Sequence, residues 1–527
     1  ENRGGVLRDE DREALERQQI FLAPHGMEQF HLEIQNLYAA LAQPTEKLTV
    51  SYPVSDGKGA EKRPSFVIGR IARLLPSISV ETESTDKEYR LSVKSTALEY
   101  AGEHIGGALW QYFEGQGDAE RALAAMKDAS RYTRGHLSRD AVRALYGGAV
   151  TLSASRMDMA RSCHFAYFMR YGLKARERTG AGFDAPQIGT FVHDVMEHTL
   201  RQAKECGGLH TLSKDKLHAL VRASIEEYID RVLPDLCEKS ARFRYLFNRL
   251  CAAVERIMDE VSEELQSSDF EPLAFELEFG ADGQLPAITI REENGTARVV
   301  GKVDRVDGWL HDGKLYLRVV DYKTGKKSFD LAELRYGLGL QMLLYLFTLK
   351  EEGQMLFGGH EIVPAGVLYT PAREPMLRCA RDTEPEKIEK ALKKELRRSG
   401  MVLEDPAVLQ AMEHSALESP CYLPIAVKRD GAVMGSLASA EQLGKLSKYV
   451  DHILHEITQE VFAGNIDADP YARTPQQSAC TYCEFASACH FENGCGSDRM
   501  EYIKATKNDE FWQYIDEVNG EGAHENG

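Results

Sequence analysis

The sequence predicts an α/β protein in which long helices flank a sheet. Residues 273–323 contain runs rich in β-branched and aromatic residues, interrupted by an Asp-Gly pair. Charged stretches with helical periodicity precede them, and an apolar helix and a returning strand follow, up to residue 369. This order of helices, strands, helix and strand is typical of an α/β core.

Length and composition indicate an ordinary globular protein. The 527 residues suggest about three domains. With 43% hydrophobic and 28% charged residues, collagen, coiled-coil rods and wholesale disorder are excluded. The formal charge of -18 means that any affinity for nucleic acid must come from local basic grooves. The longest apolar run, residues 337–349, is shorter than the roughly 20 residues that span a bilayer. Without a secretory signal either, we expect a cytoplasmic protein with no membrane partner.

The pattern along the chain predicts four regions. Residues 1–90 read as the end of an α/β domain, with a helix at 27–41 and a strand at 47–52. Residues 91–150 read as a helical linker, and residues 151–500 carry every recognisable motif. An acidic, Gly-rich flexible tail is expected at 501–527.

Individual elements are predicted within the third region. Helices are expected at 155–171, 187–206, twice between 213 and 267, at 331–350 and over much of 380–465; strands are expected at 273–279, 297–309, 314–323 and 366–369.

A predicted hairpin carries the most informative residues. The pair Asp312-Gly313 favours a tight turn between two β-rich runs, so Asp304 and Asp321 can face each other on paired strands. Side chains alternate along a strand, so Asp321 and Lys323 share a face and the carbonyl of Tyr322 lies near it. Two carboxylates and a carbonyl are the hard oxygen ligands that suit Mg²⁺ or Mn²⁺. Lys323 could then offset charge on a phosphate.

A simpler interpretation exists for the same residues, because most charged strand residues only form cross-strand ion pairs on a solvated face. Two helical pairs favour the metal site. His193 and Glu197 lie one turn apart on one predicted helix, although a lone helical His is more often a packed one. Gln341 and Tyr345 have the same spacing in an apolar stretch, where an unpartnered amide costs free energy.

Taken in order, these residues resemble a known family. The pattern Gly189-Thr190…His193, Gly301-x-x-Asp304, Asp321-x-Lys323 and Gln341-x-x-x-Tyr345 is similar to the RecB-like branch of the PD-(D/E)XK nucleases, which have a restriction-endonuclease-like core. The resemblance implies that His193, Asp304, Asp321 and the carbonyl of Tyr322 hold the metal, and that Lys323 is catalytic. It also implies that Gln341 and Tyr345 support the active site or DNA binding.

Three cysteines near the C-terminus indicate a second metal site. Cys480, Cys483 and Cys489 fall within ten residues, which in a reducing compartment favours metal ligation over disulfides. The RecB-like family includes members in which one upstream Cys and three downstream Cys bind a [4Fe-4S] cluster, and Cys163 fits the upstream position. Ligand count alone does not separate this cluster from a structural zinc.

The first 90 residues carry a second resemblance. Asn36 to Tyr52 are similar to the last conserved motif of UvrD-type superfamily 1 helicases, with Ala42-Gln43 in place of the usual Thr-Arg. Without that arginine, and without a Gly-x-x-x-x-Gly-Lys-Ser/Thr loop, we expect no ATP hydrolysis by this chain. A degenerate helicase tail before an iron-sulfur nuclease resembles the C-terminal part of the AddB family, the second subunits of bacterial AddAB helicase-nucleases.

That resemblance implies a Mg²⁺-dependent deoxyribonuclease that cuts single-stranded DNA, on the 5′-ended strand, when broken double-strand ends are resected for recombinational repair. An AddA-type helicase-nuclease subunit is the implied partner, and the bacterial nucleoid the implied place. The alternative from another class is a non-catalytic DNA-binding scaffold that supports a partner helicase. An iron-sulfur electron carrier is disfavoured because no flavin or dinucleotide loop is present.

Overall fold

The computed structural model describes residues 9–20, 22, 26–54, 61–78, 90–131, 133–176, 185–234, 240–280, 283–375, 377, 379, 383–474 and 476–525. Contacts between residues divide the chain into two compact units, residues 1–103 and 104–527. The predicted domain boundaries at 90 and 150 therefore stay predictions, and each unit is described by itself.

The described part of the first unit is helical. It contains α1 (Asp9–Arg17), α2 (Gly26–Ala42), α3 (Phe66–Leu74) and α5 (Lys94–Glu103). Helix α2 confirms the helix predicted at 27–41. The strand predicted at 47–52 was wrong: those residues form no strand, and no strand lies among the described residues of this unit to pair with them. A β-prone segment needs a hydrogen-bonded neighbour to become a strand.

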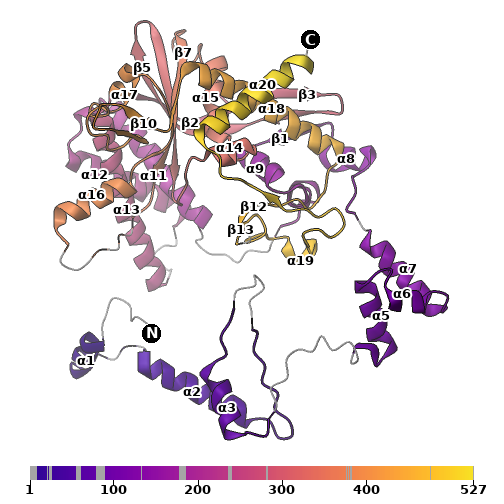
Figure 1. Cartoon of the computed structure of the whole chain (residues 1–527). Coiled ribbons are helices and arrows are strands. Elements are labelled where there is room, and N and C mark those ends of the chain that lie inside the picture. The colour runs from indigo at the N-terminus through magenta and orange to yellow at the C-terminus, as the bar shows by residue number, and fades with distance from the viewer. Residues whose placement is uncertain are drawn as a thin grey trace. The chain divides into compact units, whose positions relative to one another are not determined.

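A six-stranded sheet organises the second unit (Figure 1) and confirms the predicted α/β class. Its order is β11-β8-β7-β6-β5-β2. Strands β6 and β7 are parallel, whereas β2, β5 and β6 form an antiparallel meander. The bounds are β2 (Glu271–Phe279), β5 (Gly301–His311), β6 (Lys314–Lys323), β7 (Glu361–Pro371), β8 (Ser399–Leu403) and β11 (Leu437–Ala438).

The predicted hairpin is confirmed. His311 pairs with Lys314, so Asp312 and Gly313 form a two-residue turn, with φ of 49° and 78°. Both angles are in the left-handed region, which Asp tolerates and Gly adopts freely, as a hairpin turn of this type requires. The turn fixes the register of β5 against β6.

Helices cover the sheet, as Figure 1 shows. Helix α11 contacts β2, and α15 packs on β6 and β7. Helix α18 begins with a capping box between Ser439 and Gln442 and ends at Gly464, in the left-handed conformation. The bounds of the longer helices are α11 (Ala185–Glu205), α12 (Lys214–Val232), α13 (Ala241–Gln266), α15 (Gln341–Glu352), α16 (Pro385–Glu395), α18 (Ala440–Ala463) and α20 (Asn508–Glu525).

Two predicted helices are interrupted. The helix expected at 155–171 is divided at Cys163, which is extended between α9 (Ala154–Ser162) and α10 (His164–Tyr167); a π-helical turn, Phe168–Gly172, follows. The helix expected at 331–350 ends early as α14 (Leu331–Arg335). Gly337 and Gly339 have positive φ, so they break the helix before α15 begins.

Smaller elements complete the second unit. Three helices lie near its start: α6 (Ala108–Phe113), α7 (Asp118–Ser130) and α8 (Arg139–Tyr146). The small sheets contain β1 (Ala149–Leu152), β3 (Ile288–Glu292) and β4 (Gly295–Val299); β9 (Ile425–Val427) and β10 (Val433–Gly435); and β12 (Tyr471–Thr474), β13 (Gln477–Ser478) and β14 (Glu501–Tyr502). Two short helices are α17 (Pro406–Met412) and α19 (Ala486–Cys489). The region 380–465, predicted to be largely helical, thus also contributes strands to the fold.

The flexible tail predicted at 501–527 was wrong for most of its length. Helix α20 contacts α18 and α14, and it buries the side chains of Phe511, Trp512 and Ile515. These apolar residues recur at helical spacing and outweigh the acidic composition of the segment.

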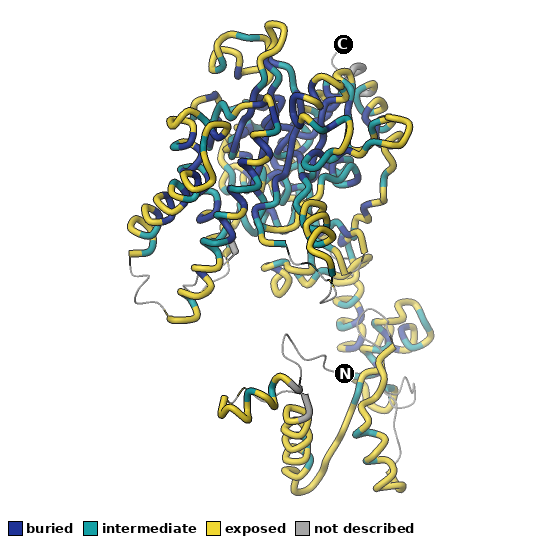
Figure 2. The backbone as a smooth tube through the Cα atoms, turned by 90° about the vertical axis from the view of Figure 1, so that its left-hand side faces the viewer, coloured by how far each residue is buried: buried dark blue, intermediate teal, exposed yellow. Residues whose placement is uncertain are grey.

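Buried residues concentrate in the central sheet and the helices packed on it (Figure 2). They include most of α15, where Met342 to Leu349 are all buried. Within the described residues, no helix combines the length and apolar character needed to cross a membrane.

A cluster of buried charges lies behind strands β5 and β6. Arg305, Asp307 and Arg318 are fully buried, and Glu264 and Arg398 nearly so. Asp307 Oδ2 accepts hydrogen bonds from Arg305 Nη2 at 3.0 Å and Arg318 Nε at 2.9 Å. Glu264 Oε2 accepts from Arg398 Nη2 at 2.6 Å. These pairs tie the strands to α13, and each charge has a partner of opposite sign, as a buried ion requires.

Replacing Glu264 should therefore be costly. Burial alone would raise its pKa, but Arg398, Arg318 and Arg305 lower the pKa of Glu264 from 4.5 to about 2. We expect Glu264→Gln to reduce the free energy of unfolding at neutral pH by about 3–5 kcal/mol, because it leaves buried arginines unpaired.

The carboxylate stabilises the fold fully above pH 4.5, and this contribution is lost as the pH falls towards 2. Urea unfolding across this range should therefore show a smaller pH dependence in Glu264→Gln than in the wild type. Glu271→Gln, at an exposed position, is the control. Equal stabilities for the two variants would contradict the proposed role of this cluster.

Candidate functional site

The register of the hairpin brings two aspartates together. Arg305 pairs with Val320, so the next pair along the two strands is Asp304 and Asp321. The backbone N–H of Tyr322 donates to Asp304 Oδ2 at 2.8 Å, which holds that carboxylate against β6. Asp304 raises the pKa of Asp321, which places the two carboxylates within electrostatic range of each other. The structure thus places these two residues side by side, as the sequence predicts.

Helix α11 adds His193 to this pair. Its Nε2 donates to the carbonyl of Tyr322 at 2.8 Å, and its Nδ1 lies 3.3 Å from Asp304 Oδ2. Burial alone would lower its pKa, but Asp304, Asp321 and the Tyr322 carbonyl raise the pKa of His193 to about 9. Three of the four ligands predicted from the sequence therefore converge on one point, with a proton between them.

Asp321 lies beside the predicted catalytic lysine. Lys323 Nζ is 2.6 Å from Asp321 Oδ2. Burial first, and then the neighbouring Asp304, raise the pKa of Asp321 to about 6. Two carboxylates this close resist ionising together, so a cation between them would stabilise both charged forms.

A residue that sequence reasoning missed completes the group. Among the described residues, His193, Glu276 and Asp304 form a set whose ligand atoms all lie within 4.8 Å of one another. Glu276 is on β2, opposite Asp304 in register, and its φ of 50° is unusual for a strand residue other than Gly. The alternation Glu276, Glu278 along β2 was the available signal.

The donor set fits a hard divalent cation. Carboxylate oxygens, a backbone carbonyl and one imidazole are ligands that Mg²⁺ and Mn²⁺ accept. Glu197, predicted to share the helix face of His193, instead pairs with Arg201 at 2.8 Å.

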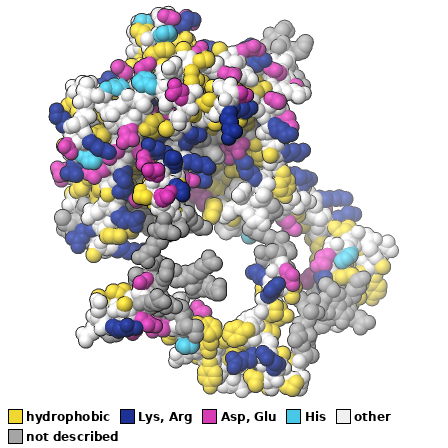
Figure 3. All heavy atoms as spheres, turned by 60° about the vertical axis from the view of Figure 1, so that its left-hand side comes forward, with side chains coloured by type: hydrophobic (Ala, Val, Ile, Leu, Met, Phe, Trp, Pro, Cys, Tyr) yellow, Lys and Arg dark blue, Asp and Glu magenta, His cyan; other side chains and the backbone are white. Residues whose placement is uncertain are grey.

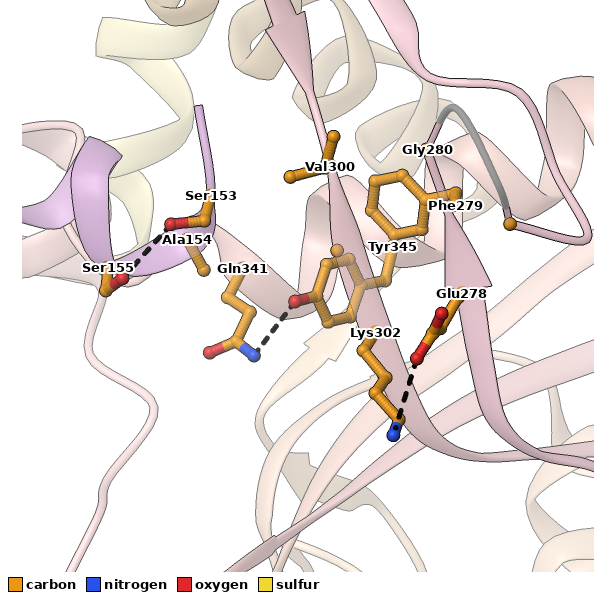
Figure 4. A pocket seen from close by; sticks show the side chains of 12 residues that line it. Ser153, Ala154, Ser155, Glu278, Phe279, Gly280, Val300, Lys302, Gln341 and Tyr345 are labelled. Atoms are coloured by element: carbon orange, nitrogen blue, oxygen red, sulfur yellow. Dashed lines mark hydrogen bonds and ion pairs between the residues drawn. The ribbon is translucent and has the colours of Figure 1, made fainter. Parts of the chain in front are cut away.

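Gln341 and Tyr345 lie next to this group. Gln341 Nε2 donates to the Tyr345 hydroxyl at 3.1 Å, so the amide has the partner that its position demands. The buried ring of Tyr345 packs edge-on against Phe279, with centroids 5.2 Å apart. The helical spacing predicted from the sequence is confirmed, and both side chains face the same cavity (Figure 4).

Comparison with known families decides the classification. The family model for the PD-(D/E)XK nuclease superfamily matches residues 151–490, more than half of the chain. The chain belongs to the PD-(D/E)XK nuclease superfamily. The residues gathered on β5, β6 and α11 are thus the part of a superfamily fold in which a nuclease site is expected.

Several curated proteins match the chain over nearly its full length. A protein of Ruminiclostridium cellulolyticum is 30% identical over 98% of this chain and 47% of its own length. One of Acetivibrio thermocellus is 31% identical over 97% of this chain and 46% of its own. Both are named as the second of the subunits of an ATP-dependent helicase/deoxyribonuclease. The chain therefore spans about half the length of the relatives it matches.

The four cysteines of this PD-(D/E)XK chain lie around one region. Cys163 is buried between α9 and α10, and burial first, with Cys489 among the lesser causes, raises its pKa to about 12. Burial, Cys483 and Cys489 raise the pKa of Cys480 to about 11. Each thiolate therefore disfavours its neighbours, and a bound cationic centre would relieve that repulsion.

Contacts other than the cysteines bring these segments together. The backbone N–H and ring of His164 both contact Asp469, at 2.9 and 2.5 Å. Arg134 donates to Asp498 at 2.8 Å and to the carbonyl of Cys489 at 2.8 Å. Arg170 pairs with Glu484 at 2.8 Å. Protein contacts thus position the cysteine-bearing segments.

The packing at Gly301 yields a prediction. A Cβ added there would lie 2.5 Å from Phe279 Cζ and 2.5 Å from Tyr345 Cε1, so Gly301→Ala must displace both rings. We expect it to lower the free energy of unfolding by about 1–3 kcal/mol in urea titrations. Gly325→Ala is the control, because a Cβ there meets nothing within 4 Å. Equal effects of the two variants would show that the rings are not held as described.

Proposed function

We propose that this chain is a divalent-metal-dependent deoxyribonuclease that hydrolyses DNA phosphodiesters. The observation that carries the proposal is the meeting of Asp304, Asp321, His193 and the Tyr322 carbonyl, with Lys323 beside them. Acids on adjacent strands with a nearby amine are the arrangement that a phosphodiester cleaved at a metal ion requires. The scaffold alternative gives no reason to gather these groups.

Each residue has a distinct proposed role. His193, Asp304, Asp321 and the Tyr322 carbonyl would hold Mg²⁺ or Mn²⁺, with Glu276 as a further carboxylate. Such an ion would polarise the phosphate and acidify an attacking water. Lys323 would offset the negative charge that develops on the phosphate oxygens. Gln341 and Tyr345 would line the path of the DNA strand.

The names of the relatives support a wider proposal for the biological setting. We place the chain in a complex with an AddA-type helicase-nuclease subunit, acting on broken double-strand ends at the bacterial nucleoid. Residues 1–90 would be the remnant of a helicase-like domain, with ATP hydrolysis left to the partner. The substrate would be single-stranded DNA, on the 5′-ended strand, during end resection and recombinational repair.

We also propose that Cys163, Cys480, Cys483 and Cys489 bind a [4Fe-4S] cluster. A zinc ion with Zn–S bonds of about 2.3 Å needs its sulfurs about 3.8 Å apart. Among the described residues, no three of these sulfurs lie within 4.8 Å of one another. A cluster with iron and sulfide between the thiolates separates them more widely, so the spacing favours it over zinc.

Substitution of the acid and the amine tests the nuclease. We expect Asp321→Ala and Lys323→Ala to abolish Mg²⁺-dependent cutting of single-stranded DNA, because one removes a ligand and the other the charge beside the phosphate. Both should keep their fold and iron content. Product length on denaturing gels is the measurement, and Lys326→Ala, in the loop after β6, is the control. Full activity in either test variant would remove the proposal, whereas DNA binding without cutting by the wild type would favour the scaffold.

Iron analysis tests the cluster. Protein purified without oxygen should be brown and should contain about four iron atoms per chain. Cys480→Ala and Cys163→Ala should lose both colour and iron. Cys495→Ala should retain them, although Cys495 lies close by in sequence. A colourless, zinc-loaded wild type would contradict the assignment.

A further inference from the structure

A cavity opens beside the candidate metal centre (Figure 4). Its volume is about 570 Å³, within the range of pockets that hold small organic ligands. Its walls come from the start of α9, from β2 and β5, and from α15. The residues used below are Ser153, Ser155, Phe279, Lys302, Gln341 and Tyr345.

The walls of the cavity differ in chemistry. The hydroxyls of Ser153 and Ser155, 3.1 Å apart, stand on one side, with the amide of Gln341 next to them. The ammonium of Lys302 stands on the other side, and Phe279 and Tyr345 supply aromatic surface between them. Donors and a cation suit a phosphate, whereas aromatic walls suit a sugar and a base.

The cavity continues from the metal centre along one strand. Lys302 precedes Asp304 by two residues on β5, so both side chains project to the same face, about 7 Å apart. That distance is roughly one nucleotide of extended backbone. A strand whose reacting phosphate lies at Asp304 therefore has its neighbouring nucleotide beside Lys302.

Lys302 is also linked to the metal group. Its Nζ lies 2.5 Å from Glu276 Oε2 and 3.5 Å from Glu278 Oε1, and its side chain is about half exposed. A divalent ion at His193, Glu276 and Asp304 would compete with the ammonium for Glu276. Lys302 would then be available to a phosphate in the cavity.

The surface charge explains why such a contact matters. In the face shown in Figure 3, Lys and Arg are interspersed with Asp and Glu rather than gathered in one broad basic patch. With a formal charge of -18, the chain must hold an anionic strand through individual cations.

We propose that this cavity binds the nucleotide next to the scissile phosphate of a single DNA strand, and that Lys302 contacts its phosphate. The inference rests on the proposed function and names a binding site for that function's substrate. Lys302 is a binding residue here, distinct from Lys323 beside the reacting phosphate.

Salt dependence of DNA binding tests the contact. A fluorescent single-stranded oligothymidylate is titrated with the Lys323→Ala chain, which is expected to bind without cutting, at a fixed low Mg²⁺ concentration. Adding Lys302→Gln should weaken binding roughly fivefold. It should also reduce the slope of log Kd against log salt concentration by about 0.7, the share of one phosphate contact on a single strand. A purely structural role of Lys302 would leave the slope unchanged.

Lys314→Gln is the matched control. Lys314 is also on the hairpin, is 47% exposed against 48% for Lys302, and pairs with Glu361 at 2.9 Å, but it lies outside the cavity. It should leave both affinity and slope unchanged. The same change in slope for both variants, or none for Lys302→Gln, would overturn the inference.

A second variant tests the cavity independently of the lysine. Ser155→Glu places a carboxylate at an exposed position of its wall and should weaken oligothymidylate binding at least as much. Unchanged affinity would overturn the site. Cutting by the wild type is measured separately: if it cuts while both variants bind normally, the inference fails and the proposed function stands. If the wild type does not cut but Lys302→Gln lowers the slope, the binding site stands and the function fails.

Discussion

Repulsion between two carboxylates is the constraint around which the second unit is arranged. The β5–β6 register fixes Asp304 beside Asp321, and neither can move away without slipping the whole hairpin. The surrounding groups answer that repulsion: His193 carries a shared proton, Lys323 pairs with Asp321, and the N–H of Tyr322 donates to Asp304. A divalent ion would take over the role of these cationic partners. The sheet therefore supplies the geometry, and α11 supplies the means to regulate the charge.

The same two strands serve as a foundation on their other face. Asp304 and Arg305 are consecutive and project in opposite directions, one towards the metal group and one into the buried charge cluster. Arg305 Nη1 also donates to the hydroxyl of Tyr322 at 2.5 Å, so the residue that offers its carbonyl to the metal group is held by its side chain from behind. Such anchoring limits how far the carbonyl can shift.

Much of this arrangement could be predicted because its determinants are local. The Asp-Gly turn sets the hairpin, strand alternation places Asp321 with Lys323, and helical spacing places Gln341 with Tyr345. Glu276 escaped prediction because its role depends on which strand lies beside β5 and on a left-handed backbone angle, neither of which is local. Helix α20 was missed because acidic composition obscured the apolar spacing of Phe511 and Ile515. The segment 47–52 has strand-like residues, but being a strand depends on a neighbour and not on composition alone.

The contacts of Arg134 have a consequence for how this protein matures. They join α9–α10 to the C-terminal cysteine loop, and neither they nor the His164–Asp469 pair include a sulfur ligand. The chain can accordingly reach its final shape first and receive an inorganic group afterwards, with little further ordering to be done at that step. Delivery and folding become separate events, so the empty protein is a substrate for a loading machinery rather than a misfolded by-product.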